Sequence, residues 1–202
     1  MLRLILALWL SIHVAGVVAA PDDLLRLSPP SAWSDWKVES SNRNGNITLT
    51  SRSPASPQFS QWKESIVTFT FFPIGSTETA VSALRQVAML ENSVCEGMNV
   101  VPPKVKEGPG FSVAYLQTFC RRHRGLGQGR LGFFKAISGS DRIYVVGAMK
   151  VAPSEAFGPA PGMFVGDDVG WIMKWQESAA TYLAEKVFAC PDASSPREAC
   201  SE

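Results

Sequence analysis

The sequence contains very little histidine and carries almost no net charge. Its 202 residues include two histidines, and 19 Lys and Arg against 18 Asp and Glu give a formal net charge of +1. A chain without excess positive charge lacks the usual electrostatic basis for binding nucleic acid. With so few histidines, the chain also has few side chains suited to general acid–base catalysis near neutral pH. The composition therefore favours a non-enzymatic protein that does not bind nucleic acid.

Internal repeats and closely spaced metal-type cysteines are also missing, and no run after residue 20 is apolar for long enough to cross a membrane. Hydrophobic residues make up 46% of the chain and charged residues 18%, which is too apolar for a disordered protein. The length suits one domain with a sizeable core. The sequence thus predicts one folded domain with no cofactor and no metal site.

Residues 1–20 have the composition of a secretory signal peptide. Arg3 precedes a long apolar run, and small residues close that run before Pro21, as in the basic, apolar and cleavage regions of such signals. Cleavage is expected after Ala19 or Ala20. A membrane anchor is the alternative, because about 20 apolar residues can span a bilayer, but no basic cluster follows the run. We therefore expect export to the periplasm or the extracellular space, with no membrane span after cleavage.

The mature chain is predicted to contain one domain over residues 36–190. A proline-rich lead-in at 21–35 precedes it, and a tail at 191–202 follows.

Four cysteines in an exported chain favour disulfides, since an even count is typical of them. Cys190 and Cys200 flank a short polar segment, and a local bridge there leaves Cys95 to pair with Cys120. The competing metal site would need tighter spacing and neighbouring histidines.

Strand and helix patterns give the order βββ-α-ββββ-α. Strands are expected at 36–39, 47–50, 66–72, 104–106, 111–119, 130–137 and 142–151, with helices at about 76–92, capped by Ser76 or Thr77, and about 168–188, starting near Asp167 or Asp168. The predicted class is α+β, a mainly antiparallel sheet packed by two amphipathic helices. The pairs Phe71-Phe72 and Phe133-Phe134 point to opposite faces, so both faces should be covered, or one should be a binding surface.

This order of elements resembles exported proteins of the PsbP/Mog1-like fold, including the DcrB-like proteins, over most of residues 36–190. A looser likeness is to small exported proteobacterial proteins of unknown function, through the runs ITLTSRSP, WKESIVTFTFF and DRIYVV with Cys95, Cys120 and Cys190. Neither resemblance implies catalytic residues, since one fold hosts many functions.

Basic side chains cluster at Arg121, Arg122, Arg124 and Arg130 around His123 and the run GLGQG. Guanidinium groups and glycine N–H groups can together hold a carboxylate or phosphate, so this segment is a candidate site for a small anionic ligand. The alternative is a solvated hairpin turn whose arginines keep a sheet edge soluble.

Any hydrolase or transferase chemistry would have to use His123, the only histidine left after signal cleavage. The nearest nucleophile motif surrounds Ser112, but it lacks its second glycine and lies within a predicted strand. A small enzyme using His123 is therefore the alternative, and no catalytic residue is assigned.

The last helix carries Trp171 off the centre of its apolar stripe, which makes this residue a candidate exposed contact. The connector at 152–166 is long, and such loops often serve as lids or partner-binding segments. Together these features favour a non-enzymatic domain that binds an envelope or extracellular protein, or a small anionic ligand. An inhibitor or immunity protein acting on an exported hydrolase is a further alternative, with contacts at Phe157, Phe164 or Trp171.

Overall fold

The computed structural model describes residues 25–31, 33, 35–55, 64–72, 79–108, 111–139, 142–160, 162–190 and 200. The expected signal peptide at 1–20 and nearly all of the tail at 191–202 lie outside the described residues.

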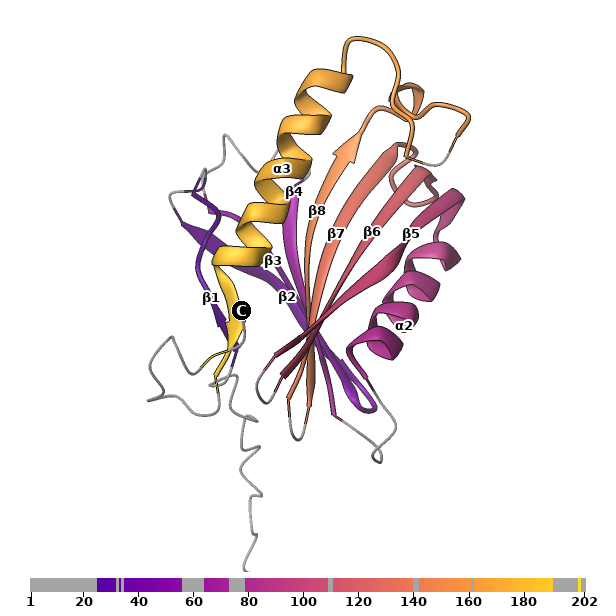
Figure 1. The fold of residues 1–202 in the computed structure, drawn as a ribbon. Helices are drawn as coiled ribbons and strands as arrows, with labels where there is room; N and C mark the ends of the chain where they lie inside the picture. Colours follow the sequence, from indigo (N-terminus) through magenta and orange to yellow (C-terminus); the bar gives the residue numbers. More distant parts are fainter. Residues whose placement is uncertain are drawn as a thin grey trace, which may run out of the picture.

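Seven strands form one antiparallel sheet in the order β2-β3-β4-β8-β7-β6-β5, and β1 and β9 form a separate pair (Figure 1). The elements are β1 Leu25–Leu27, β2 Trp36–Asn44, β3 Ile47–Pro54, β4 Glu64–Phe71, α2 Ala80–Ser93, β5 Cys95–Gly108, β6 Phe111–His123, β7 Gly129–Ser138, β8 Ile143–Ala152, the short 3-10 helix η2 Ser154–Ala156, α3 Val169–Glu185 and β9 Val187–Ala189. The predicted α+β class and the order of its main elements are confirmed.

The two helices cover opposite faces of the sheet (Figure 1). Alternation along the strands sends Phe134 to the core under α2 and Phe133 to the core under α3. Burial of apolar area on both faces is the main stabilising term of such a layered domain. The expectation that both faces are covered is therefore confirmed.

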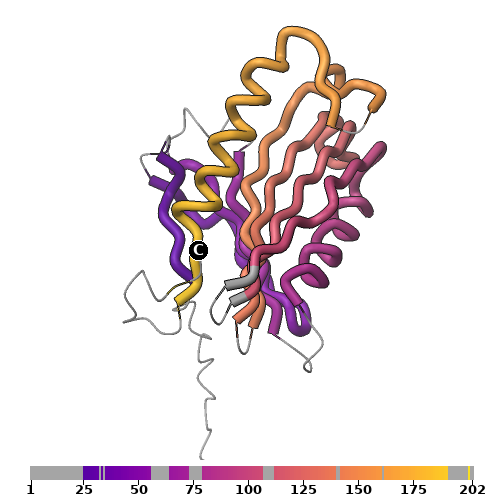
Figure 2. Tube along the Cα trace, viewed as in Figure 1, coloured from indigo at the N-terminus to yellow at the C-terminus, as the bar shows by residue number. Residues whose placement is uncertain are grey.

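Strands β1 and β9 bring the first and last described elements side by side, indigo beside yellow in Figure 2. The fully buried Lys135 of β7 donates from Nζ to the carbonyl of Val187 in β9 at 2.8 Å. A buried ammonium needs such acceptors, because its desolvation is costly. This bond ties β9 to the main sheet.

The predicted boundaries of both helices were partly wrong. Helix α2 begins at Ala80, because Thr79 and Ser82 cap each other's backbone N–H groups at 3.1 and 2.8 Å; the expected caps Ser76 and Thr77 lie outside the described residues. Helix α3 begins after Asp168 as expected, but it ends at Glu185. Residues 187 and 188 were predicted as helix, but Val187–Ala189 form β9 and pair with β1.

Strand β5 was predicted only at 104–106 and runs over Cys95–Gly108 as the edge of the sheet. Pro102 and Pro103 lie where its register with β6 shifts, a position that tolerates residues without an N–H donor. The lead-in likewise contains β1.

Both predicted disulfides are present, with Cα–Cα distances of 5.7 Å for Cys95–Cys120 and 4.1 Å for Cys190–Cys200. The first joins the start of β5 to β6, and the second holds residue 200 against the end of β9. In the described part of the chain, no helix is both long and apolar enough to cross a membrane.

Close packing predicts opposite effects for two glycine substitutions. A Cβ at Gly147 in β8 would lie less than 3 Å from the ring of Phe134, whereas one at the exposed Gly170 in α3 meets nothing within 4 Å. Gly147→Ala should lower the free energy of unfolding by about 1–3 kcal/mol through overpacking. Gly170→Ala should raise it by up to about 1 kcal/mol through helix propensity. Urea unfolding measures both, and an equal effect of the two would contradict this packing.

Candidate functional site

The arginines proposed to hold an anion do not converge on one site. Arg121 and Arg122 are consecutive exposed residues of β6, so they point to opposite faces of the sheet. Arg124 is exposed in the turn and lies 3.9 Å from a carboxylate oxygen of Glu96. Arg130 is half-buried in β7 and forms an ion pair with Glu91 of α2. The segment therefore has the structure of a solvated hairpin turn with one half-buried arginine.

The Glu91–Arg130 pair joins α2 to the sheet, with side-chain exposures of 11% and 17%. Burial raises the pKa of the Glu91 carboxyl, and the positive charge of Arg130 opposes this shift. Arg130 thus neutralises a carboxylate that has already lost most of its water. Arg130 therefore balances the charge of Glu91 within the fold.

His123 is half-buried at the end of β6, and its Nδ1 accepts a hydrogen bond from the Gly125 N–H at 3.2 Å. Burial, and then the charge of Arg130, lower its pKa. A neutral ring that accepts at Nδ1 carries its proton on Nε2, so neither nitrogen has a free lone pair for general-base work. Among the described residues, no hydrogen bond joins His123 to a hydroxyl or carboxylate that could complete a triad.

Trp171 is half-buried rather than exposed. Its Nε1 donates to Asp168, and the Lys150 ammonium lies 5.1 Å from the centre of its ring. In the connector, Phe157 is only 7% exposed, and its ring packs against that of Phe164 at 5.6 Å. The connector residues proposed as partner contacts thus belong to a small aromatic core. A binding role for Trp171 stays a prediction.

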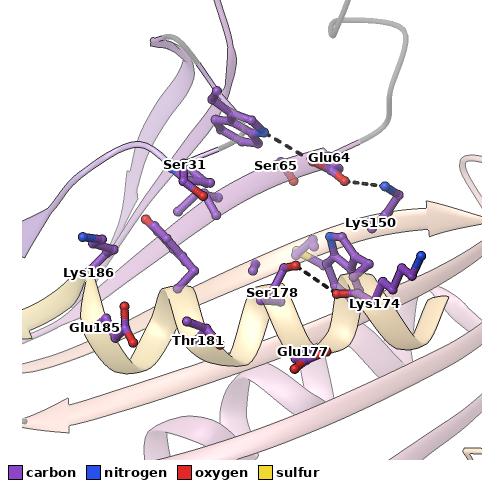
Figure 3. Close-up of a pocket in the computed structure, with 18 residues that line it drawn as sticks. Ser31, Glu64, Ser65, Lys150, Lys174, Glu177, Ser178, Thr181, Glu185 and Lys186 are labelled. Atoms are coloured by element: carbon purple, nitrogen blue, oxygen red, sulfur yellow. Dashed lines mark hydrogen bonds and ion pairs between the residues drawn. The ribbon is translucent and has the colours of Figure 1, made fainter. Parts of the chain in front are cut away.

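A groove of about 760 Å³ runs along α3 on the face of the sheet that this helix covers. A second wall is the start of β4, around Glu64, together with the part of β8 that pairs with it, around Lys150. A third wall is formed by the lead-in residues Pro30, Ser31 and Trp33. Figure 3 shows α3 on one side and Ser31, Glu64 and Ser65 on the other. We call this feature the α3 groove. Its volume is typical of ligand-binding clefts.

One end of the α3 groove is polar and ordered. Glu64 of β4 forms an ion pair with Lys150 of β8 and accepts a hydrogen bond from Trp33 Nε1 at 3.3 Å. Lys174 lies at this end, and Glu185 and Lys186 lie at the other (Figure 3). Charges of both signs therefore line the groove along its length.

Tyr182 contributes the groove's one buried polar group without a partner among the described residues. The residue is 6% exposed, yet its hydroxyl makes no hydrogen bond there. Burial raises the pKa of this phenol, and the positive charge of Arg52 partly opposes the rise. Arg52 itself donates to Thr68 Oγ1 at 3.0 Å. A buried hydroxyl left unpaired is costly, and in the described part of the chain Arg130 Nε and Ser154 Oγ, which do not line the groove, are likewise buried without a partner.

Sequence reasoning missed this site because its members are far apart in the chain. Trp175 and Tyr182 lie at helical spacing among the apolar residues of the last predicted helix, where core packing is the default expectation, and Glu64 and Lys150 are separated by 86 positions. The only local signal was the polar hydroxyl of Tyr182 inside an apolar stripe.

No protein-family model and no curated protein matches the chain. The resemblance to PsbP/Mog1-like proteins stays a prediction.

Substitutions of Arg130 and of the exposed Arg122 test how much the ion pair of Arg130 contributes to stability. Arg130→Met should lower the free energy of unfolding by about 3–5 kcal/mol at neutral pH, because it leaves Glu91 charged and buried. Arg122→Met should change it by less than about 0.5 kcal/mol.

The loss in the free energy of unfolding caused by Arg130→Met, called the deficit below, should also depend on pH. The pKa of Glu91 is raised in the folded state, so its stabilising protonation is complete below the unfolded pKa and is lost as the pH rises through the folded pKa. Without Arg130 this pKa rises further. The deficit should therefore shrink as the pH falls from neutral into the acid range, and chemical unfolding at several pH values measures it. A deficit independent of pH would rule out an ionised, buried Glu91.

Removing the Tyr182 hydroxyl should stabilise the free protein. Tyr182→Phe keeps the ring and deletes only an unpaired buried group, so the free energy of unfolding should rise by about 1 kcal/mol. Thermal and urea unfolding show whether the free energy of unfolding rises or falls. A loss of stability would mean that the hydroxyl has a partner within the fold.

Proposed function

We propose that this chain is an exported, non-enzymatic domain that binds a protein partner through the α3 groove. The observation that carries the proposal is the groove itself, an open cleft with a buried, unpartnered Tyr182 hydroxyl at its wall. Buried polar groups are ordinarily paired, so a partner whose binding opens this wall would satisfy the hydroxyl.

Export is supported by the two disulfides and by the composition of residues 1–20. Disulfides persist in oxidising compartments such as the periplasm and the extracellular space. The signal-like run has the three regions by which such peptides are recognised.

A protein partner suits the charges of the groove better than a free anion does. Three lysines (Lys150, Lys174 and Lys186) and three glutamates (Glu64, Glu177 and Glu185) line it. A small inorganic anion would favour a cluster of one sign, and the arginine turn does not supply one. A partner surface, by contrast, carries both signs and can match both.

The two alternative functions have less support. A hydrolase or transferase would need a free lone pair on His123, whose Nδ1 accepts the Gly125 N–H. An inhibitor or immunity protein is one form of partner binding, but Phe157 is part of the core. Its substitution would therefore test folding and not contact.

Site-specific photo-crosslinking in the host cell tests the proposal. A photoreactive residue replaces Thr181, which is exposed at the groove, or as a control Met89, which is 64% exposed on α2 across the sheet. The full chain is expressed from its own start, and adducts are identified by mass spectrometry in the exported fraction.

The Thr181 variant should form a discrete adduct with one exported protein, and the Met89 variant should not. Adducts from Met89 alone, equal adducts from both, or none from Thr181 would contradict binding through the groove. Recovery of the chain only in the cytosol would contradict export.

A further inference from the structure

The ladder between β1 and β9 is the shortest among the described strands. It comprises three residue pairs, from Leu25↔Ala189 to Leu27↔Val187, and Figure 2 shows the two strands side by side. Pro29 and Pro30 follow β1 after one residue, and a proline has no N–H group to donate to a ladder. These prolines therefore limit β1 to a short strand.

Strand β9 is held in place by contacts that do not involve β1. The Val187 carbonyl accepts the hydrogen bond of the buried Lys135 at 2.8 Å, and Cys190, the residue after β9, is joined to Cys200. At its other end β9 begins two residues after α3 ends. The edge of β9 that faces β1 is therefore expected to keep its position when β1 leaves.

The packing of β1 is weaker than that of the strand it pairs with. Leu25 and Leu27 are half-buried against the core under α3, whereas Val187 and Ala189 opposite them are fully buried. A half-buried side chain gains only part of its transfer free energy, and each ordered residue loses backbone entropy. We therefore expect β1 to open at a lower free energy than the long strands of the main sheet.

The edge of β9 without β1 would have a defined chemistry. Backbone N–H and C=O groups at a strand edge pair with another extended chain, as in strand addition. Leu25 and Leu27 occupy two places against the apolar core, at the spacing of neighbouring side chains on one face of a strand. A chain that replaces β1 must therefore be extended and carry apolar side chains at alternate positions.

We propose that the edge of β9 binds an extended, alternately apolar segment of a partner protein, and that β1 occupies this edge in the free protein as a displaceable strap. This site goes beyond the proposed function, because it follows the C-terminal end of α3 and uses backbone pairing instead of the α3 groove. The partner segment competes with the strap, so its apparent affinity falls with the fraction of molecules whose strap is open.

Hydrogen exchange tests whether the strap opens. Amide exchange is followed by NMR in the exported protein with its disulfides intact. The most protected amide of β1 should exchange at least about hundredfold faster than the most protected amide of β8, because local opening leaves the main sheet closed. Equal rates in the two strands would show that β1 opens only with the whole domain, and would overturn the proposal.

A peptide assay tests what the edge of β9 binds. The probe is a fluorescent capped peptide of residues 23–28, DLLRLS, and the control probe carries Leu25→Asp and Leu27→Asp. Each probe is titrated with the wild type and with the full-length double variant Leu25→Asp/Leu27→Asp, whose strap is weakened. The variant Leu126→Asp is the control protein, since Leu126 is 48% exposed in the turn after β6.

The probe should bind the double variant about tenfold or more tightly than it binds the wild type or Leu126→Asp, because the intact strap competes with it. The control probe should bind none of the three proteins. Equal binding of the probe to the double variant and the wild type, or no binding to the double variant, would overturn the proposal.

Unfolding of the double variant, seen by circular dichroism, would also overturn it, because β1 would then be part of the cooperative core. None of these measurements uses a residue of the α3 groove. A crosslink from Thr181 can therefore succeed when they fail, and the reverse.

Discussion

The pairing of β4 with β8 is the constraint on which the rest of the structure depends. Eight consecutive residue pairs, from Glu64↔Lys150 to Phe71↔Ile143, join the first three strands to the last four. Without this ladder the chain would form a three-stranded and a four-stranded sheet, and each core would be divided, since Phe69 of β4 packs with Val145 of β8 on one face and Ile66 with Val146 on the other. The same pairing positions the Glu64–Lys150 ion pair at the wall of the α3 groove. Fold and candidate site thus share one long-range contact.

The contrast among three buried polar groups explains why the site is assigned to the groove. Glu91 is buried but neutralised by Arg130, and Lys135 donates to Val187. Both are satisfied within the fold and need no ligand. Tyr182 is buried to a similar degree, yet its hydroxyl makes no such bond within the described part of the chain. An unpaired buried hydroxyl costs stability, and the proposed function assigns this cost to the wall of the groove.

Local patterns were enough to predict the main strands, both helices and both disulfides. They failed where distant residues decide the structure: Val187 continues the helical spacing of α3, but pairing with Leu27 makes it a strand. Strand β5 was mostly missed because an edge strand with Pro102 and Pro103 shows little alternation. The groove could not be predicted at all, since it depends on Glu64, Lys150 and Tyr182 meeting across three elements. The arginine cluster was visible in sequence, but strand alternation separates its members.

Chemical-shift mapping by NMR tests the central claim most directly. The isotopically labelled protein is titrated with the partner identified by crosslinking from Thr181, and backbone amide shifts are followed. Binding in the α3 groove predicts large shifts at Ser178 and Thr181, which line it, with little change at Gly125 and Gly127 in the arginine turn. Shifts concentrated at those two glycines, with Ser178 and Thr181 unmoved, would place the ligand at the arginines and contradict the assignment of the site.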